Sequence, residues 1–533
     1  MRPHDPTAAT DRDAVDDPHR LASCYLAAVC GQGPLIIRHW RGEWHRWHGG
    51  AYRTVSDGDM RADITDHIRE EFILAGEMEP EDDDKGPRST RKVSTRLVGD
   101  TLNALAGMTH VGDAIDAPAW IDGETGPDPA GLIVTRSGIL DVAAWTDGRP
   151  DCVLKLTPAL WTPTALPFAF AAHAPTPKRW LAFLGQLWPD DPDSIACLQE
   201  WMGYLLTADT RQQKMLFLLG PKRAGKGTIA RIIRELVGPL NVAGPTLGTL
   251  ATNFGLSGLL GKTVAIISDA RLSGRTDSAV VVERLLAISG EDAIGVDRKF
   301  RDAIAVKLPT RFVIISNELP RLGDASGALA GRLILLRFTR SFFGGEDTGL
   351  TDALLAELPG ILLWALQGLK RLRARGRLMQ PESGAEMVAE MEDLGSPVGA
   401  FVREKCVIEP EASVPTPELY AAYRAWCEAH GRKEVTTAEG FGRDLRAAVP
   451  QLDKKRRRQG SERWWDYTPI RLRRFDEADP ADDELGHQGH RGHGGYAFNA
   501  LRFPESDSAE KEVENHSDLY DPRDPWQGQR LPD

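Results

Sequence analysis

Lys226 lies in a glycine-rich segment whose residue types and spacing are typical of a phosphate-binding loop. The segment reads Gly-Pro-Lys-Arg-Ala-Gly-Lys-Gly-Thr over residues 220–228. Its glycines let backbone N–H groups close around phosphate oxygens, and the lysine ammonium neutralises the β- and γ-phosphates. We therefore expect all nine residues of the loop to bind a nucleotide: Gly220, Pro221, Lys222, Arg223, Ala224, Gly225, Lys226, Gly227 and Thr228.

The segments on either side of this loop match what such a site requires. Residues 215–219 form a short apolar run that predicts a buried strand, and apolar residues recur at helical spacing from Ile229 to Leu236. Gly227 occupies the position where a serine or threonine normally binds Mg²⁺, so this ligand is either displaced to Thr228 or replaced by water. Adenylate-kinase-like enzymes also carry Gly-Lys-Gly-Thr, so the loop alone does not choose a family.

Three later strand-like runs carry polar residues at their ends. Two of them end in Asp269 and Asn317, and the third begins at Arg332. Strands alternate with helices over residues 207–375, which predicts a parallel sheet, and ligands bind such sheets beyond the carboxyl ends of the strands. Gly220, Asp269 and Asn317 are therefore expected to converge on one crevice.

These side chains suit the hydrolysis of a nucleotide, which needs positioning and charge neutralisation. Asp269 can bind Mg²⁺, directly or through water, and help to polarise the attacking water. Asn317 can orient that water or contact the γ-phosphate, and Arg332 suits an arginine finger supplied to a neighbouring subunit's site. The alternative interpretation is structural: strand-terminal Asp and Asn side chains cap turns, and Arg332 forms a surface salt bridge.

A basic and aromatic hairpin is predicted between the second and third of these strands. Two short β-like segments flank Arg298, Lys299, Phe300 and Arg301. Such a hairpin can grip a sugar-phosphate backbone and stack on bases. The alternative is a solvated charged turn.

A second basic cluster lies near the end of the chain, within residues 396–475. Helical patterns are followed there by a basic run and by strand-like sequence that contains Trp464 and Trp465. The basic run consists of Lys454, Lys455, Arg456, Arg457 and Arg458. Helices followed by a basic hairpin predict a winged-helix-like domain that binds DNA, and a solvated basic loop is again the alternative.

The composition of the 533-residue chain is that of a soluble globular protein with several domains. Its six cysteines lack the spacing of a zinc site or a disulfide framework, which fits a reducing cytoplasm. No apolar run approaches membrane-spanning length, so no membrane partner is expected. Residues 476–533 carry fifteen acidic and five basic side chains, a net charge of −10 out of −12, which leaves −2 for the rest. A DNA partner is therefore compatible with the charge.

Patterning divides the chain into five parts. Residues 1–20 are polar and expected to be disordered, and residues 21–172 mix short strands and helices in an α+β region. Residues 173–380 form the nucleotide-binding α/β domain, and residues 396–475 form the winged-helix-like domain. The acidic tail, residues 476–533, is expected to be disordered.

Five segments of the chain resemble the phage/plasmid and poxvirus primase-helicase family, in the family's own order. They span residues 198–207, 220–228, 285–292, 316–320 and 324–332. The resemblance implies a superfamily 3 helicase with an AAA+ ATPase core that forms a hexameric ring. ATP is then hydrolysed between subunits, and single-stranded DNA is drawn through a pore lined by the hairpin of Lys299. Many such helicases end the second strand in two acids, whereas here Ser268 precedes Asp269.

The sequence thus predicts an ATP- and Mg²⁺-dependent DNA helicase or translocase that forms a homo-hexamer. We expect it to replicate a phage or another mobile genetic element in the cytoplasm of a bacterial host, with duplex or forked DNA at the C-terminal domain. Primase activity is not expected, because residues 21–172 offer only Asp57 and Asp59 and no zinc motif. Two other functions stay open: a replication initiator that uses ATP as an assembly switch without unwinding, and a nucleotide kinase.

Overall fold

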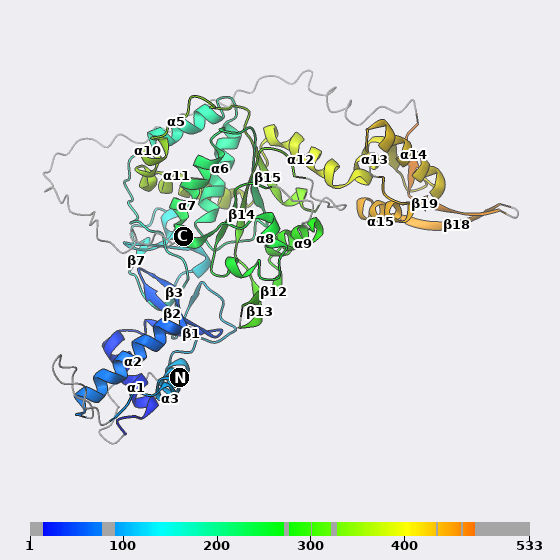
Figure 1. The fold of residues 1–533 in the computed structure, drawn as a ribbon. Helices are drawn as coiled ribbons and strands as arrows, with labels where there is room; N and C mark the ends of the chain where they lie inside the picture. Colours follow the sequence, from blue (N-terminus) through cyan, green and yellow to red (C-terminus); the bar gives the residue numbers. More distant parts are fainter. Residues whose placement is uncertain are drawn as a thin grey trace. The chain divides into compact units, whose positions relative to one another are not determined.

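A five-stranded parallel sheet lies at the centre of the α/β part of the computed structural model (Figure 1). Across the sheet the strand order is β10-β11-β14-β9-β15, and every neighbouring pair is parallel. The strands are β9 (Met215–Leu219), β10 (Val242–Ala243), β11 (Val264–Ile267), β14 (Arg311–Ser316) and β15 (Leu333–Arg337). The expected α/β core is confirmed, and the short edge strand β10 was not predicted. The structure describes residues 14–76, 91–270, 277–299, 301–320, 328–432, 435–459 and 462–474.

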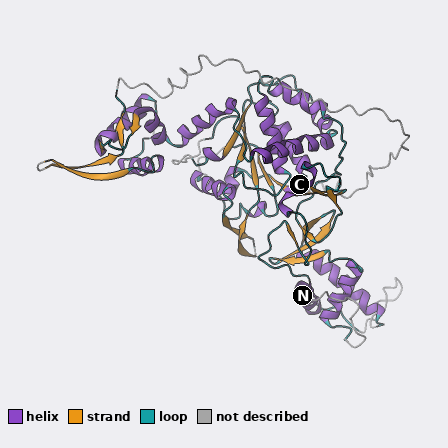
Figure 2. Ribbon diagram, turned by 180° about the vertical axis from the view of Figure 1, so that it is seen from behind, coloured by secondary structure: helices purple, strands orange, loops and turns teal. Residues whose placement is uncertain are grey.

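Helices cover both faces of this sheet, which Figure 2 shows as purple ribbons on either side of the orange strands. They are α5 (Lys178–Leu187), α6 (Pro192–Leu205), α7 (Lys226–Val237), α8 (Leu247–Leu250), α9 (Ser278–Ser289), α10 (Leu350–Leu355) and α11 (Leu358–Arg375). Strands covered on both faces are continuous apolar runs, because every side chain meets a neighbouring layer. The runs at β9, β11 and β14 were recognisable in the sequence for that reason.

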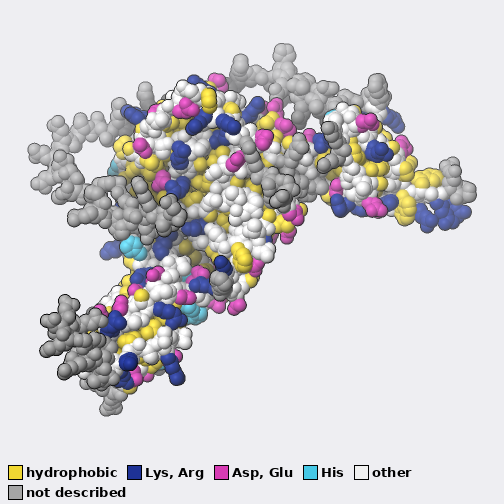
Figure 3. Space-filling model, viewed as in Figure 1, with side chains coloured by type: hydrophobic (Ala, Val, Ile, Leu, Met, Phe, Trp, Pro, Cys, Tyr) yellow, Lys and Arg dark blue, Asp and Glu magenta, His cyan; other side chains and the backbone are white. Residues whose placement is uncertain are grey.

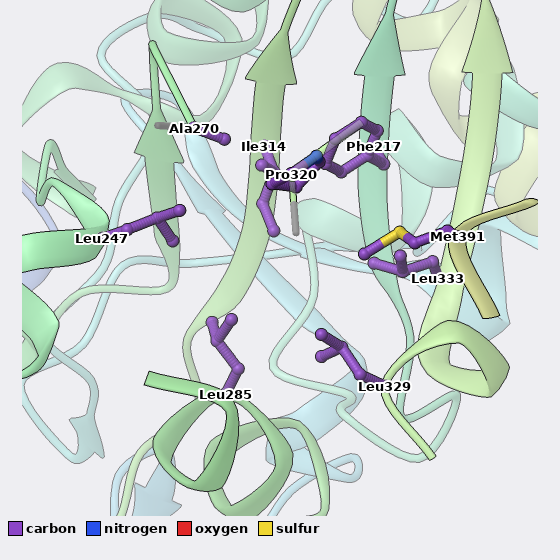
Figure 4. Close-up of a pocket in the computed structure, with 9 residues that line it drawn as sticks. All are labelled: Phe217, Leu247, Ala270, Leu285, Ile314, Pro320, Leu329, Leu333 and Met391. Atoms are coloured by element: carbon purple, nitrogen blue, oxygen red, sulfur yellow. The ribbon is translucent and has the colours of Figure 1, made fainter. Parts of the chain in front are cut away.

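Two hydrophobic clusters, one on each face, hold the sheet between its helices. Leu216 and Leu218 of β9 pack against α6, α7 and α11 in the first cluster. Phe217 packs in the second, together with Leu285 of α9. The small cavity in the second cluster is lined by Phe217, Leu247, Ala270, Leu285, Ile314, Pro320, Leu329, Leu333 and Met391 (Figure 4). All nine lining side chains are apolar, so we interpret this cavity as a packing gap in the core.

The N-terminal region is α+β, as expected. Its helices are α1 (Pro18–Cys30), α2 (Asp57–Leu74), α3 (Thr95–Met108) and α4 (Val142–Thr146). Its strands are β1 (Ile37–Trp40), β2 (Glu43–His48), β3 (Ala51–Val55), β4 (Ala119–Trp120), β5 (Leu132–Thr135), β6 (Gly138–Asp141), β7 (Val153–Leu154) and β8 (Leu160–Trp161). Strands β1, β2 and β3 form an antiparallel meander, whose first connection runs through Arg41 and Gly42.

Between β11 and β14 the chain forms the expected antiparallel hairpin. Its strands are β12 (Ala293–Arg298) and β13 (Arg301–Lys307), and Arg298 pairs with Arg301 at its end. Phe300, the predicted stacking residue, lies outside the described residues.

The C-terminal part contains the expected helices and basic hairpin. Its helices are α12 (Glu382–Gly395), α13 (Pro397–Lys405), α14 (Thr416–Ala429) and α15 (Ala438–Ala448). Its strands are β16 (Cys406–Ile408), β17 (Val414–Pro415), β18 (Asp453–Gln459), β19 (Glu462–Thr468) and β20 (Ile470–Leu472). A separate hydrophobic cluster, with Phe401 and Phe441 fully buried, holds α13, α14 and α15 together. The winged-helix assignment itself stays a prediction.

One predicted boundary is wrong. Residues 1–20 were expected to be disordered, yet helix α1 begins at Pro18. The Asp17 side chain caps this helix by accepting a hydrogen bond from the Arg20 N–H, and proline occupies its first position. Both are standard helix-start signals that the polar composition masked. Residues 1–13 and the acidic tail lie outside the described residues. No helix in the described ranges has the length and apolar character needed to span a membrane.

Candidate nucleotide site and nucleic-acid interfaces

The phosphate loop connects β9 to α7, as the sequence predicts, and two of its glycines are required by geometry. Gly225 precedes α7 with φ +86°, in the left-handed region that favours glycine, and a Cβ there would also meet Phe183 and Leu187 of α5. A Cβ on Gly220 would lie 2.4 Å from the carbonyl oxygen of Phe338, just after β15. Both ends of the loop therefore pack tightly against neighbouring segments, and the exposed Lys222 and Arg223 lie between these ends.

The Lys226 side chain is buried inside the loop, with 6% of its surface exposed. Its ammonium donates hydrogen bonds to the carbonyl oxygens of Gly220 at 2.6 Å and Pro221 at 2.7 Å, and to the Asn317 side-chain oxygen at 3.1 Å. Burial lowers the pKa of Lys226 below its ordinary value. A lysine held in this way is positioned for an anion that enters the loop.

Asn317 follows the carboxyl end of β14, the neighbour of β9, and Asp269 follows that of β11, the next strand along the sheet. Asn317 follows β14, where Ser316 pairs with Leu219 of β9, and the Gly220 N–H donates to the Ser316 carbonyl at 3.3 Å. Asp269 follows β11, and the N–H of the next residue, Ala270, donates to the Ile315 carbonyl at 3.0 Å. The loop, the amide and the acid thus share one edge of the sheet, with a direct contact between Lys226 and Asn317.

Arg332 lies at the amino ends of the strands, whereas the phosphate loop lies at their carboxyl ends. It precedes β15, whose first residue Leu333 pairs with Met215, the first residue of the parallel strand β9. Its guanidinium lies beside Gly290, at the end of α9. Burial lowers the pKa of Lys214, and the positive charge of Arg332 lowers it further. Among the described residues, the buried Nη1 atom of Arg332 has no hydrogen-bond partner. The structure therefore does not bring Arg332 together with the phosphate loop of its own chain.

The side chains at the loop edge fit ATP and Mg²⁺. Helix α7 begins directly after Gly225, and no described side chain caps its first N–H groups. Uncapped N–H groups at a helix N-terminus bind anions, and Lys226 adds a cation. The Thr228 hydroxyl and the Asp269 carboxylate are oxygen donors of the kind that Mg²⁺ prefers. The described residues contain no cluster of three metal-binding His, Cys, Asp or Glu side chains, so phosphates and water would complete the ion's coordination.

The tip of hairpin β12–β13 contacts the N-terminal meander. Arg301 forms an ion pair with Glu43 of β2 at 2.6 Å, and Arg298 lies 3.6 Å from the same carboxylate. Arg298 also donates to the Arg41 carbonyl at 3.2 Å, and Arg301 lies 3.6 Å from Asp57. Two of the cations expected to grip DNA are therefore neutralised by acids of the same chain. Lys299, between them, is exposed and has interactions of its own.

The second basic cluster forms strand β18. The side chains of Lys454, Lys455, Arg456, Arg457 and Arg458 are all exposed, and Figure 3 shows dark-blue side chains gathered on this hairpin beside yellow ones. Trp465 of β19, directly opposite Arg456, is 45% exposed. Arg457 forms an ion pair within the hairpin, with its Nε atom 3.3 Å from the carboxylate of the buried Asp466. This surface combines positive charge with an accessible aromatic ring.

Some residues at these sites had no recognisable signal in the sequence. The segment after β15 closes over the phosphate loop: the Ser341 hydroxyl donates to the Lys222 carbonyl at 2.9 Å, and the Phe342 N–H to the Arg223 carbonyl at 2.9 Å. Glu346 adds an ion pair to Arg223 at 3.4 Å. The two hydrogen bonds join positions more than a hundred residues apart through backbone carbonyls, which carry no residue-type signature. Glu43, which neutralises the first hairpin, was likewise unpredictable from local sequence.

Asp57 and Asp59, considered above as a weak metal pair, have a structural role. They lie in the first turn of α2, where Ser56 caps the helix and donates to the Asp59 carboxylate at 2.7 Å. Acids are favourable at this end of a helix.

Two parts of the chain match known families. Residues 218–332, which include the phosphate loop, match the family described as "Family of unknown function (DUF5906)". Residues 396–474, which include the basic hairpin β18–β19, match the family described as "Poxvirus D5 protein-like". The match over residues 396–474 supports the resemblance to the phage- and poxvirus-type primase-helicases. The resemblance inferred from the sequence is thus confirmed, and for this family a role in DNA replication is expected.

Similar solved structures include two of the apo NrS-1 C-terminal region. The A form has 10% identity to this chain and a TM-score of 0.45, and the match covers 84% of this chain and 99% of that chain. Another apo structure of the region has 11% identity and a TM-score of 0.46, with 84% and 98% covered. With TM-scores below 0.5, these similarities do not bear on the function.

Proposed function

We propose that this primase-helicase relative is an ATP-dependent DNA helicase or translocase that hydrolyses ATP at the edge of the sheet formed by the loop, Asn317 and Asp269. The observation that carries the proposal is the contact between Lys226 and Asn317 beside an uncapped helix N-terminus. This arrangement offers a nucleotide a cation, backbone N–H groups and a side-chain amide at one point.

Each residue has a distinct part in this proposal. Lys226 exchanges its loop carbonyl contacts for the β- and γ-phosphates, and the N–H groups of the loop hold the phosphate oxygens. Asn317 orients the attacking water or contacts the γ-phosphate. Asp269 polarises that water and, with Thr228 or a water in its place, holds Mg²⁺, which neutralises developing charge on the phosphates when it is bound.

Arg332 is proposed to act on the site of a neighbouring subunit in a homo-hexameric ring. Its position at the opposite edge of the sheet from its own loop supports this role, as does the buried Nη1 atom that has no partner among the described residues. A polar atom of this kind is normally satisfied in the assembled protein. An arginine supplied in trans stabilises the charge that develops during phosphoryl transfer.

The DNA is proposed to contact both hairpins, with residues 396–474 forming a winged-helix-like domain in an AAA+ protein of superfamily 3. The exposed cations of β18 also favour a second candidate function, a replication initiator that binds origin DNA without unwinding it. Strand displacement on forked DNA distinguishes the two, because an initiator binds the fork and leaves its strands paired.

The proposal predicts that an equal mixture of Lys226→Ala and Arg332→Ala protein hydrolyses ATP although each variant alone does not. A subunit with Lys226 intact can receive the arginine of a Lys226→Ala neighbour, so about a quarter of the sites in the mixture are complete. The measurement is DNA-stimulated ATP hydrolysis at constant total protein, with Arg231→Ala, on the exposed face of α7, as the matched control. A mixture no more active than the two variants measured separately would rule out the role of Arg332 in trans.

A further inference from the structure

Hairpin β18–β19 has two chemically different faces, which the register of its strands defines. Directly opposed residues of an antiparallel pair project on the same face, and successive residues alternate between faces. Lys454 opposes Tyr467, Arg456 opposes Trp465, and Arg458 opposes Arg463. We call this side of the hairpin the Trp465 face. The other side, the Asp466 face, carries Asp453, Lys455, Arg457, Gln459, Glu462, Trp464, Asp466 and Thr468.

The two faces differ in net charge. On the Asp466 face, Asp453 and Asp466 offset Lys455 and Arg457, and Arg457 is paired with Asp466. Within the described part of the hairpin, the Trp465 face carries four cations and no carboxylate. The Lys454 ammonium lies 5.4 Å from the Trp465 ring, so charge and ring form one continuous surface.

The base of the Trp465 face is fixed to the domain, whereas its outer part is exposed. Tyr467 is 2% exposed and contacts α15, where a Cβ on Gly442 would lie 2.7 Å from the tyrosine hydroxyl. Trp465, two residues further out on the same face, is 45% exposed. A large aromatic ring held on an anchored strand among cations is a preorganised contact surface.

We propose that the Trp465 face binds unpaired nucleotides, with phosphates on its cations and one base stacked on the Trp465 ring. An exposed ring can stack only on a base whose own face is accessible, and paired bases within a duplex hide theirs in the stack. A protein partner would have to offer carboxylates to four cations, and duplex DNA would leave the ring without a contact. The strand-separated part of a replication fork supplies both phosphates and open bases.

This inference rests on the proposed function, because it takes DNA to be the partner. It adds which face of the hairpin contacts the DNA, and that the contacted DNA is unpaired. The test uses the full chain without nucleotide and measures its affinity for three DNAs of equal length by fluorescence anisotropy. They are an oligothymidine strand, a strand whose nucleotides lack bases, and a blunt duplex. The strand without bases keeps the phosphates and removes stacking.

The wild-type protein is expected to prefer the oligothymidine to the strand without bases by about tenfold, within the range measured for one base–aromatic stack. Trp465→Ala should lose this preference while its affinity for the strand without bases stays within about twofold. Trp465→Phe should keep most of the preference, because phenylalanine also stacks. Trp464→Ala, on the Asp466 face, is the matched control and should keep it entirely.

The salt dependence of DNA affinity provides a second test of the same inference. Arg456→Gln should reduce the slope of log affinity against log salt concentration by about 0.7, the value for one phosphate contact of a single strand. Arg457→Gln, the next residue on the Asp466 face, should leave the slope unchanged. Thermal melting of each variant confirms that the hairpin substitutions have not unfolded the domain.

Several outcomes would overturn the inference. Trp465→Ala could keep the preference for bases, Arg457→Gln could lower the slope as much as Arg456→Gln, or the wild type could bind the duplex more tightly than the oligothymidine. If the wild type hydrolyses ATP and binds DNA while any of these results appears, the inference alone fails. If it neither binds these DNAs nor hydrolyses ATP with DNA present, the proposed function fails with it.

Discussion

The two basic hairpins of this protein carry similar residues but have different surroundings. In β12–β13, Arg298 and Arg301 are neutralised by Glu43 of the N-terminal meander, and only 11% of the Arg298 side chain is exposed. In β18–β19 every cation of the basic run is exposed, and Asp466 engages Arg457 on one face. Similar sequence signals have therefore produced one hairpin held by its own chain and one open to a partner.

The difference shows what a basic cluster in a sequence indicates and what it leaves open. Residue types establish that a segment can attract phosphate, but the charge available to DNA depends on acids brought close by the fold. For β12–β13 the decisive acid is more than two hundred residues away in the sequence. We infer that β18–β19 is the main DNA contact without nucleotide, and that DNA competes with Glu43 for the cations of β12–β13.

The largest expected difference between the hairpins concerns DNA affinity. Replacing Lys454, Arg456 and Arg458 together by glutamine should lower the affinity for single-stranded DNA about 100-fold at 0.1 M salt, because about two counterions fewer are released. The matched variant replaces Arg298, Lys299 and Arg301 by glutamine. It should lose less than about fivefold, because two of its cations are already paired.

Fluorescence anisotropy without nucleotide measures both affinities, and circular dichroism confirms that both variants remain folded. A larger loss from the β12–β13 variant than from the β18–β19 variant would contradict the comparison. Equal losses would mean that the contact with Glu43 does not reduce the charge available to DNA.

A smaller effect is expected from releasing the first hairpin. Glu43→Gln removes the carboxylate that Arg298 and Arg301 share, and affinity for single-stranded DNA should rise about two- to fivefold, in line with the strength of partly exposed ion pairs. Asp66→Asn is the control, because Asp66 is an exposed residue of α2 that pairs with Arg69. The gain should disappear when Glu43→Gln is combined with Arg301→Gln. Unchanged or weaker binding by Glu43→Gln alone would argue against competition between Glu43 and DNA.

The part of the fold that the sequence predicts best is the part where local and tertiary requirements coincide. The run at 215–219 had to be a buried strand, and Gly225 had to precede a helix, because the phosphate loop needs both. Four sheet strands were recognisable as long apolar runs. The fifth, β10, has two residues and two half-buried side chains, so it has neither the length nor the periodicity of a strand signal.

For the candidate site, the positions at strand ends could be predicted from the sequence, whereas the contacts between distant segments could not. The sequence placed Asn317 and Asp269 at the correct edge of the sheet, because strand ends and parallel order fix that edge. The hydrogen bond between Lys226 and Asn317, the closure of 341–346 over the loop and the pairing of Glu43 with Arg301 depend on how distant segments pack. Such contacts have no local pattern, so only the structure reveals them.

We propose that Lys226, held at the loop edge beside Asn317, is required for ATP hydrolysis, and DNA-stimulated hydrolysis by Lys226→Ala measures this requirement. We predict that the wild-type protein releases phosphate from ATP faster with single-stranded DNA, and that Lys226→Ala is at least about 100-fold slower. The variant should still bind single-stranded DNA through β18–β19, which shows that it is folded. Hydrolysis by a folded Lys226→Ala protein at the wild-type rate would contradict the account.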